Sequence, residues 1–439
     1  MKLLKIICTI LFVLGISVSV ISQQQWTAVN SPTGNDLWNV FFCDTLNGWI
    51  GGDTGVIIRT SNGGISWNLQ NSGVQNFIKS VFFLNKDTGF ALSWEFDKNP
   101  PNYYGTRILS TTNGGNIWSN YLFRDTNLFL NTIYFTDSQN GFMGGSEGKL
   151  YYTSNSGTDW IRATVDSALV SGFPVEKISF VNSSTGFAAG GAFDIAGMIW
   201  KTTNRGRNWR ADIVGPEPLN DIYVTNANEI LCVGGDYEYG ASRITTTNGG
   251  INWNYLEIGV FGICRSVDYR TSSEAWIALG IVDSFLVTTN NGSSWILRPA
   301  PDGAQLFSLT FTNERNGWAV GKNGKILKFN PDITDITEEK ANITESIVLH
   351  QNYPNPFNPA TRITYELRDS KFITLSIFDI LGNEITTLVN EKQNTGIYNL
   401  DFNGTNLASG IYIVKISAGE SNNSGIKATI KSAKMLLIK

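Results

Sequence analysis

Apolar and polar residues alternate in short runs along most of this chain, and one such run returns seven times. Each copy has six residues with period-2 apolar positions, which is the signal of a half-buried β-strand. The copies are LWNVFF (37–42), IKSVFF (78–83), LNTIYF (130–135), VEKISF (175–180), LNDIYV (219–224), CRSVDY (264–269) and LFSLTF (306–311). A polar turn and a second strand follow each copy, as in NGWIGG from Asn47, and a third strand such as GVIIRT ends at Thr60.

A short loop closed by tryptophan ends six of the repeats. It reads TSNGGISW at Thr60–Trp67 and TTNGGNIW at Thr111–Trp118, and it recurs before Trp160, Trp209, Trp253 and Trp295. Asn-Gly favours a hairpin because both residues tolerate positive φ. The Asn and Thr side chains can also bond loop amides. We expect each tryptophan to start a fourth strand and to pack between neighbouring sheets.

The loop tryptophans recur every 42 to 51 residues, a period typical of a β-propeller whose repeats are four-stranded blades. The chain has seven first strands but only six complete tryptophan loops. Trp26 resolves the difference, because the seventh repeat stops after its third strand near Asn330. We therefore predict that the segment at Trp26 completes the last blade and closes a seven-bladed β-propeller over residues 23–330.

The N-terminus indicates export. Lys2 and Lys5 precede an apolar stretch, Ile6–Ile21, and small or polar residues suit cleavage before Gln23, so residues 1–22 are predicted to be a signal peptide. No other apolar run is long enough to cross a bilayer. The net charge of −4 argues against general nucleic-acid binding.

Cysteine and histidine, which often bind metals or take part in nucleophilic catalysis, are scarce in this chain. Cys43, Cys232 and Cys264 are odd in number and fall in different repeats, so we expect buried thiols without disulfides. The single histidine, His350, lies outside the repeats, which argues against a His-ligated metal or a Ser-His triad in the propeller. We expect no cofactor, no metal, no catalytic residue and a monomer.

Composition changes after Asn330. Residues 331–348 are polar and are predicted to be a linker, and residues 349–439 form a second module. Three prolines within Tyr353–Pro359 favour an extended entry to a strand. Strands are predicted at 373–379, 384–389, 396–402, 410–416 and 434–439. This pattern predicts a small Ig-like β-sandwich, so the whole chain is all-β.

Two resemblances extend this interpretation. The tryptophan loops resemble the Asp-box (BNR) repeat of sialidases, with Asn in place of Asp. The whole repeat looks most like propellers related to the photosystem II assembly and stability factor, over roughly 23–330. The second module resembles the type A C-terminal sorting domain of the type IX secretion system through YPNPFNPAT, DILGNEI, LASGIYIVKI and KMLLIK. The sorting motif is Tyr353, Pro354, Asn355, Pro356, Phe357, Asn358 and Pro359.

The second resemblance implies a partner and a destination. It implies the type IX secretion machinery as the partner of residues 349–439, and export through the outer membrane to the cell surface or the medium. It also often implies removal of the module and attachment of the passenger at the surface. An Ig-like module with another binding role is the alternative.

The Asp-box resemblance implies that the tryptophan loops face away from the functional side. Trp26, Trp67, Trp118, Trp160, Trp209, Trp253 and Trp295 are then framework residues. The loops between second and third strands lie on the functional face, and three are long: 93–106, 190–197 and 234–240. Their aromatic rings can stack on sugars or peptide side chains while carboxylates accept hydrogen bonds. The candidates are Trp94, Tyr103, Tyr104, Asp194, Asp236, Tyr237 and Tyr239, beside Phe96, Asp97, Phe193 and Glu238.

Ordinary loop packing is the alternative for these residues, and whether a cation binds the acids stays open. A second cluster, Arg205, Arg207 and Arg210, is interpreted as a solvated loop, with an anionic contact as the alternative.

Catalysis finds little support. A sialidase needs three converging arginines and a Tyr–Glu pair, whereas the first strands offer Arg265 and Lys79. Arg59, Arg107 and Arg243 recur in third strands and belong to the repeat. No spacing singles out an acid and base pair. We predict a non-catalytic, secreted or surface propeller that binds a glycan, peptide or protein. The alternatives are an assembly factor for a membrane complex and a sialidase-like glycoside hydrolase.

Overall fold

The computed structural model describes residues 25–98, 101–166, 172–331, 347–379, 383–419 and 429–439. The predicted signal peptide, most of the linker and part of the DILGNEI turn lie outside these ranges. No helix within the described ranges is long and apolar enough to cross a membrane.

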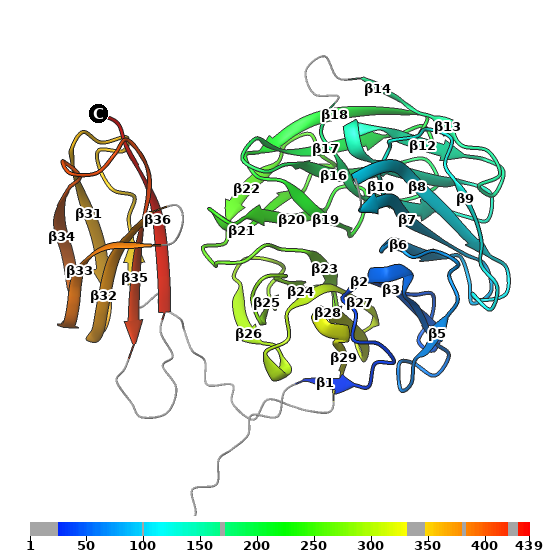
Figure 1. Cartoon of the computed structure of the whole chain (residues 1–439), viewed down its shortest axis with the longest axis horizontal. Coiled ribbons are helices and arrows are strands. Elements are labelled where there is room, and N and C mark those ends of the chain that lie inside the picture. Colours follow the sequence, from blue (N-terminus) through cyan, green and yellow to red (C-terminus); the bar gives the residue numbers. More distant parts are fainter. Residues whose placement is uncertain (1–24, 99–100, 167–171, 332–346, 380–382, 420–428) are drawn as a thin grey trace, which may run out of the picture.

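Seven sheets, six of four strands and one of five, make up the larger part of the described chain and are named blades 1 to 7 in chain order (Figure 1). Blade 1 consists of β2 (Leu37–Phe42), β3 (Gly48–Gly52), β4 (Ile57–Thr60) and β5 (Asn68–Gln70). Blade 2 consists of β6 (Ile78–Phe83), β7 (Gly89–Lys98), β8 (Pro101–Thr111) and β9 (Ser119–Leu122). Blade 3 consists of β10 (Leu130–Phe135), β11 (Gly141–Gly145), β12 (Leu150–Thr153) and β13 (Ile161–Arg162). Blade 4 is β15 (Val175–Phe180), β16 (Gly186–Ala192), β17 (Ala196–Thr202), β18 (Asn208–Gly215), with β14 (Thr164–Asp166) added parallel to β18.

Blades 5 to 7 complete the ring. Blade 5 consists of β19 (Leu219–Val224), β20 (Ile230–Asp236), β21 (Gly240–Thr246) and β22 (Asn254–Glu257). Blade 6 consists of β23 (Ser266–Tyr269), β24 (Ala275–Ala278), β25 (Ser284–Thr288) and β26 (Ile296–Pro299). Blade 7 consists of β27 (Leu306–Asn313), β28 (Asn316–Gly321), β29 (Ile326–Phe329) and β1 (Trp26–Val29). Four single 3-10 turns lie on connections: η1 (Asp53–Gly55), η2 (Ser146–Gly148), η3 (Pro301–Gly303) and η4 (Lys322–Gly324).

The ring closes through the two ends of the propeller. First strands of successive blades contact one another, and β27 of blade 7 contacts β2 of blade 1. Strand β1 pairs with β29, with Trp26 opposite Phe329. The Asn330 N–H also donates to the Gln25 carbonyl at 2.6 Å. The prediction that the Trp26 segment completes the last blade is therefore confirmed.

In five blades, a phenylalanine near the end of the first strand pairs with a glycine near the start of the second strand. Phe83 pairs with Gly89, and a Cβ on Gly89 would lie 2.4 Å from the Phe83 ring. The same pairing occurs at Phe42/Gly48, Phe135/Gly141, Phe180/Gly186 and Phe311/Gly317. Blades 5 and 6 lack both partners, with Val224 opposite Ile230 and Tyr269 opposite Ala275. The glycine is therefore needed where a phenylalanine ring covers it, and not in every blade.

The core lies between blades. Trp49 of blade 1 stacks on Phe83 of blade 2, with ring centroids 3.5 Å apart, and Trp118 meets Phe83 edge-on at 5.8 Å. Five framework tryptophans are buried, whereas Trp253 and Trp295 are half-buried. Cys232 and Cys264 are buried free thiols as expected, but Cys43 is only half-buried.

The tryptophan loops are held by their threonine and asparagine. Thr60 Oγ1 donates to Asn62 Oδ1 at 2.9 Å and accepts the Gly64 N–H, while Asn62 Oδ1 accepts the Ser66 N–H at 3.0 Å. Gly63 and Gly64, rather than Asn62, adopt positive φ, at 69° and 77°. Asn62 itself keeps an ordinary backbone conformation, and its carboxamide oxygen accepts hydrogen bonds within the loop.

The C-terminal module is a sandwich of two sheets, which agrees with the predicted β-sandwich. One sheet is β30 (Ile347–Leu349), β31 (Ala360–Leu367) and β34 (Gly396–Asn403), and the other is β33 (Glu384–Gln393), β32 (Lys371–Asp379), β35 (Gly410–Gly419) and β36 (Thr429–Leu437). Apolar side chains of both sheets form one buried cluster that includes Phe357, Tyr365 and Leu437.

Candidate binding site

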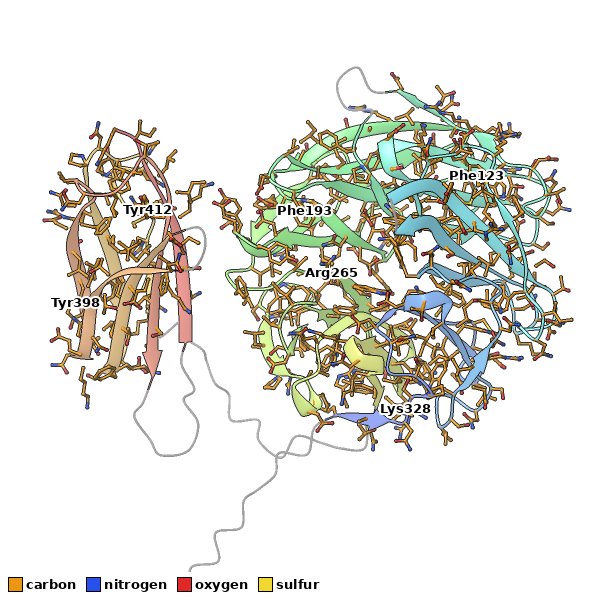
Figure 2. The ribbon with its side chains drawn as sticks, viewed as in Figure 1. Phe123, Phe193, Arg265, Lys328, Tyr398 and Tyr412 are labelled. Atoms are coloured by element: carbon orange, nitrogen blue, oxygen red, sulfur yellow. The ribbon has the colours of Figure 1, made fainter. Side chains whose placement is uncertain are left out.

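Two of the three long loops meet on the outside of the seam between blades 4 and 5. Phe193, between β16 and β17, stacks loosely on Tyr237, between β20 and β21, with ring centroids 6.4 Å apart. Their residues are 48% and 61% exposed. Tyr239 of the second loop is also exposed. The seam therefore presents an aromatic surface to solvent, on the side of the ring where Figure 2 labels Phe193.

Asp236 lies beneath these rings and shapes its loop. Its residue is 2% exposed, and Oδ1 accepts the N–H groups of Glu238 and Tyr239 at 2.8 and 2.6 Å. This turn sets the direction of Tyr237 and Tyr239. Asp236 therefore supports the exposed loop from below, while its second oxygen, Oδ2, remains available.

Glu217 is the residue that the sequence did not single out. It precedes β19 and is 2% exposed. No donor in the described part of the chain reaches Glu217 Oε2 or Asp236 Oδ2. Burial, followed by the neighbouring Asp236 carboxyl, raises the pKa of Glu217 to about 8.

Asp194 and Glu238 extend this cluster to the surface. Asp194 has positive φ, 58°, between β16 and β17. Burial and then its contact with Asp236 raise the pKa of Asp194, whereas Lys434 lowers it. We call the set Phe193, Asp194, Glu217, Asp236, Tyr237, Glu238 and Tyr239 the carboxylate–aromatic patch. None of the described residues forms a metal-binding group of three or more His, Cys, Asp or Glu.

The segment predicted as a third long loop, residues 93–106 of blade 2, is instead an extension of the β7–β8 hairpin. Trp94 Nε1 donates to the Leu130 carbonyl at 2.8 Å, and its ring lies between Phe77 and Phe129. Tyr104 is exposed. The side chains of Tyr103 and Asp97 lie outside the described residues. Trp94 therefore packs against the next blade, and no contact in the described chain joins it to the patch.

Polar side chains from the first strands of blades 2, 3 and 4 interact with one another. Lys79 of blade 2 pairs with Glu176 of blade 4 at 3.1 Å, past Asn131 of blade 3, which donates to Glu176 at 3.0 Å. Arg265 lies near the centre of the ring (Figure 2). Arg107, by contrast, pairs with Glu95 within blade 2 at 2.9 Å. Lys79 is thus neutralised, and three free arginines do not converge here in the described chain.

A groove of about 1110 Å³ lies at the outer edge of blades 4 and 5. It is lined by Trp209, Arg210, Asp212, Trp253 and neighbouring residues of both tryptophan loops. Arg210 pairs with Asp212 at 3.1 Å, and both side chains are exposed. The basic cluster is therefore partly neutralised.

The sorting motif holds the last strand of the sandwich. Phe357 is buried and exchanges backbone hydrogen bonds with Leu436 and Ile438. Asn355 Oδ1 accepts the Leu436 N–H at 2.7 Å, and Asn355 Nδ2 donates to the Lys434 carbonyl at 3.2 Å. Tyr353 is 82% exposed. The motif and the KMLLIK strand thus form one structural unit.

Comparison with known proteins assigns this unit. Residues 351–431 match the family described as secretion system C-terminal sorting domain. The C-terminal module is a secretion sorting domain. Such a domain supports export to the cell surface or the medium. The match covers the YPNPFNPAT, DILGNEI and LASGIYIVKI marks, whereas KMLLIK at 434–439 lies just after the matched residues.

The propeller is related to the photosystem II assembly factors. The chain is 25% identical to the chloroplastic photosystem II stability/assembly factor HCF136 of Oryza sativa subsp. japonica, over 70% of this chain and 82% of that protein. A structure of YCF48 bound to a D1 peptide has a TM-score of 0.56 and 20% identity, over 70% of this chain and 97% of that one.

A glycoside hydrolase shares the fold as well. The GH74 enzyme of Niastella koreensis has a TM-score of 0.54 and 12% identity, over 92% of this chain and 68% of that one. At this identity the likeness shows the propeller architecture alone. The sorting-domain prediction and the propeller prediction are confirmed.

Proposed function

We propose that this protein is an exported, non-catalytic propeller that binds a polypeptide through its carboxylate–aromatic patch. The supporting observation is the pair of exposed rings, Phe193 and Tyr237, contributed by two blades above buried carboxylates. Rings of this kind supply contact area at low entropic cost, and nearby carboxylates accept N–H groups of a ligand. The related YCF48 structure contains a bound peptide, which favours a polypeptide over a glycan.

The proposed route of export uses both ends of the chain. Residues 1–22 direct the chain across the inner membrane and are removed, residues 23–330 are the passenger, 331–348 the linker, and 349–439 the sorting domain read by the type IX machinery. We propose a monomer without a cofactor or nucleic-acid partner. Cell fractionation distinguishes this route from a membrane-complex assembly factor, which would be found in the periplasmic or inner-membrane fraction.

A peptide and glycan array probed with the full chain tests the binding site. For the best ligand, the double variant Phe193→Ala/Tyr237→Ala should bind at least about tenfold more weakly, since each exposed anchor contributes about 1 kcal/mol or more. Tyr104→Ala is the matched control, because Tyr104 is an exposed tyrosine outside the patch. Equal affinity of the double variant and the control would refute the assignment, and a glycan as best ligand would refute the polypeptide class.

The hydrolase alternative is not supported by the geometry. Glycosidases hold two carboxyl groups about 5–10 Å apart, with the sugar or a water between them. Glu217 and Asp236 are instead buried, each 2% exposed, so they do not face each other across an open cleft. We expect no turnover of sialyl or β-glucan substrates, and turnover that is lost in Asp236→Asn would overturn the non-catalytic assignment.

A further inference from the structure

The C-terminal module already places a cationic side chain on the patch. Lys434 Nζ lies 2.5 Å from Glu238 Oε1 and 5.7 Å from the Tyr239 ring centroid. Lys431 Nζ donates to the Gly259 carbonyl, in the loop after β22, at 3.3 Å. In Figure 1, β36 is the sandwich strand beside β21 and β22 of blade 5. The two parts of the chain therefore meet through lysines of one strand.

The patch suits an ammonium group. Glu217 and Asp236 are each 2% exposed and carry one carboxylate oxygen that no donor reaches in the described chain. Buried negative charge is costly unless a cation or a proton offsets it. The Lys434 charge acts on this cluster, since it lowers the pKa of Asp194. The Tyr239 ring adds a cation–π contact.

Lys434 is held in place by the sorting motif. Its carbonyl accepts Gln351 Nε2 at 2.6 Å and Asn355 Nδ2 at 3.2 Å, and its strand pairs with β35 at Ile413. The backbone of this lysine is thus fixed by Asn355 of the motif and by Gln351, two residues before the motif. Its ammonium is presented outward on a rigid strand.

From these contacts we propose that the carboxylate–aromatic patch is a site for the ammonium group of a lysine side chain, and that Lys434 occupies it within the same chain. This inference rests on the proposed function in that it names the chemistry of the ligand. It adds that Lys434 occupies the acidic side of the patch until another lysine displaces it. A tether raises the effective concentration of Lys434 at the patch to the order of millimolar, so Lys434 competes there with a free lysine ligand.

Carbodiimide coupling tests the contact without any external ligand. The reagent activates the Glu238 carboxylate, Lys434 Nζ attacks it, an amide forms, and the carboxylate oxygen leaves with the reagent as a urea. We expect a Glu238–Lys434 cross-link within the monomer of the full chain, absent from Lys434→Arg. Lys79–Glu176 is the internal control, because its side chains are 28% and 25% exposed against 30% and 27% for Lys434 and Glu238. Formation of the control cross-link alone, or a Glu238–Lys434 link only between two chains, overturns the proposal.

Displacement tests the chemistry of the site. Acetyl-Gly-Lys-Gly-amide should bind the Lys434→Ala chain about tenfold more tightly than the wild type if Lys434 occupies the patch nine-tenths of the time. The norleucine counterpart should not bind. Lys392→Ala, which removes an exposed lysine of the same module, should leave the wild-type affinity unchanged. Equal binding of the lysine and norleucine peptides would overturn the lysine site, even if Phe193→Ala/Tyr237→Ala still weakened another ligand.

Discussion

Closure of the ring through Trp26 makes the sharpest prediction about stability. Trp26 is 4% exposed and contacts the rings of Trp276, Phe285, Phe311 and Phe329. Burying a tryptophan removes about 200 Å² from water, which corresponds to about 5 kcal/mol at ~25 cal/mol/Å². Large-to-small substitutions of this kind cost about 3–5 kcal/mol. Trp26→Ala should therefore lower the free energy of unfolding of the propeller by about 3–5 kcal/mol.

Hydrogen exchange of the β29 amides, measured as a function of urea concentration, tests this effect, because β29 is the strand that pairs with β1. In Trp26→Ala, the amides of Ile326–Phe329 should exchange at lower urea than in the wild type. Trp253→Ala is the control, since Trp253 is the corresponding residue of blade 5 but only half-buried. The closure argument is wrong if Trp26→Ala leaves the exchange protection of β29 unchanged. It is also wrong if Trp26→Ala lowers the free energy of unfolding by less than Trp253→Ala does.

Three further predictions concern the framework. Gly89→Ala should lower the melting temperature, because its Cβ would lie 2.4 Å from the Phe83 ring; an unchanged melting temperature would contradict the packing argument. Asn62→Ala should lower the free energy of unfolding, measured in urea, by about 1–3 kcal/mol, because it leaves loop donors unpaired. Asn62→Asp keeps the acceptor oxygen and should lower the free energy of unfolding by less. Burial raises the pKa of Asp268 to about 7, against its hydrogen bonds from Phe311 and neighbouring residues. The folded protein therefore keeps a proton that the unfolded chain releases, and stability from this group should fall as pH rises from about 4 to 7. Unfolding curves at several pH values should show this fall relative to Asp268→Asn, and parallel pH profiles would contradict it.

The repeat was predictable because its determinants are local. Period-2 strands, the Phe/Gly pairs and the Thr-Asn-Gly loop act within one blade, and Trp26 stands out because it lacks a blade of its own. The exposed rings at Phe193 and Tyr237 were also predicted, since insertions break the repeat.

The patch was only partly predictable because ring geometry assembles it. Glu217 lies in a connection with no motif, and its burial depends on two blades meeting. Trp94 and Tyr237 were expected on one rim, but their blades are separated around the ring. The contact of Glu238 with Lys434 joins residues of two modules, and no local pattern encodes it.

The pairing of β1 with β29 has a consequence for how the chain matures. Trp26 and Phe329 are about 300 residues apart, so the last blade cannot seal until nearly the whole propeller has been delivered. Contacts of such long sequence separation form slowly. Until β29 arrives, β1 has no partner strand, and its unpaired backbone groups can pair with other chains. The interval between arrival of the first and the last blade is thus the period of greatest aggregation risk, and export factors that shorten it would protect this protein more than any change to its surface.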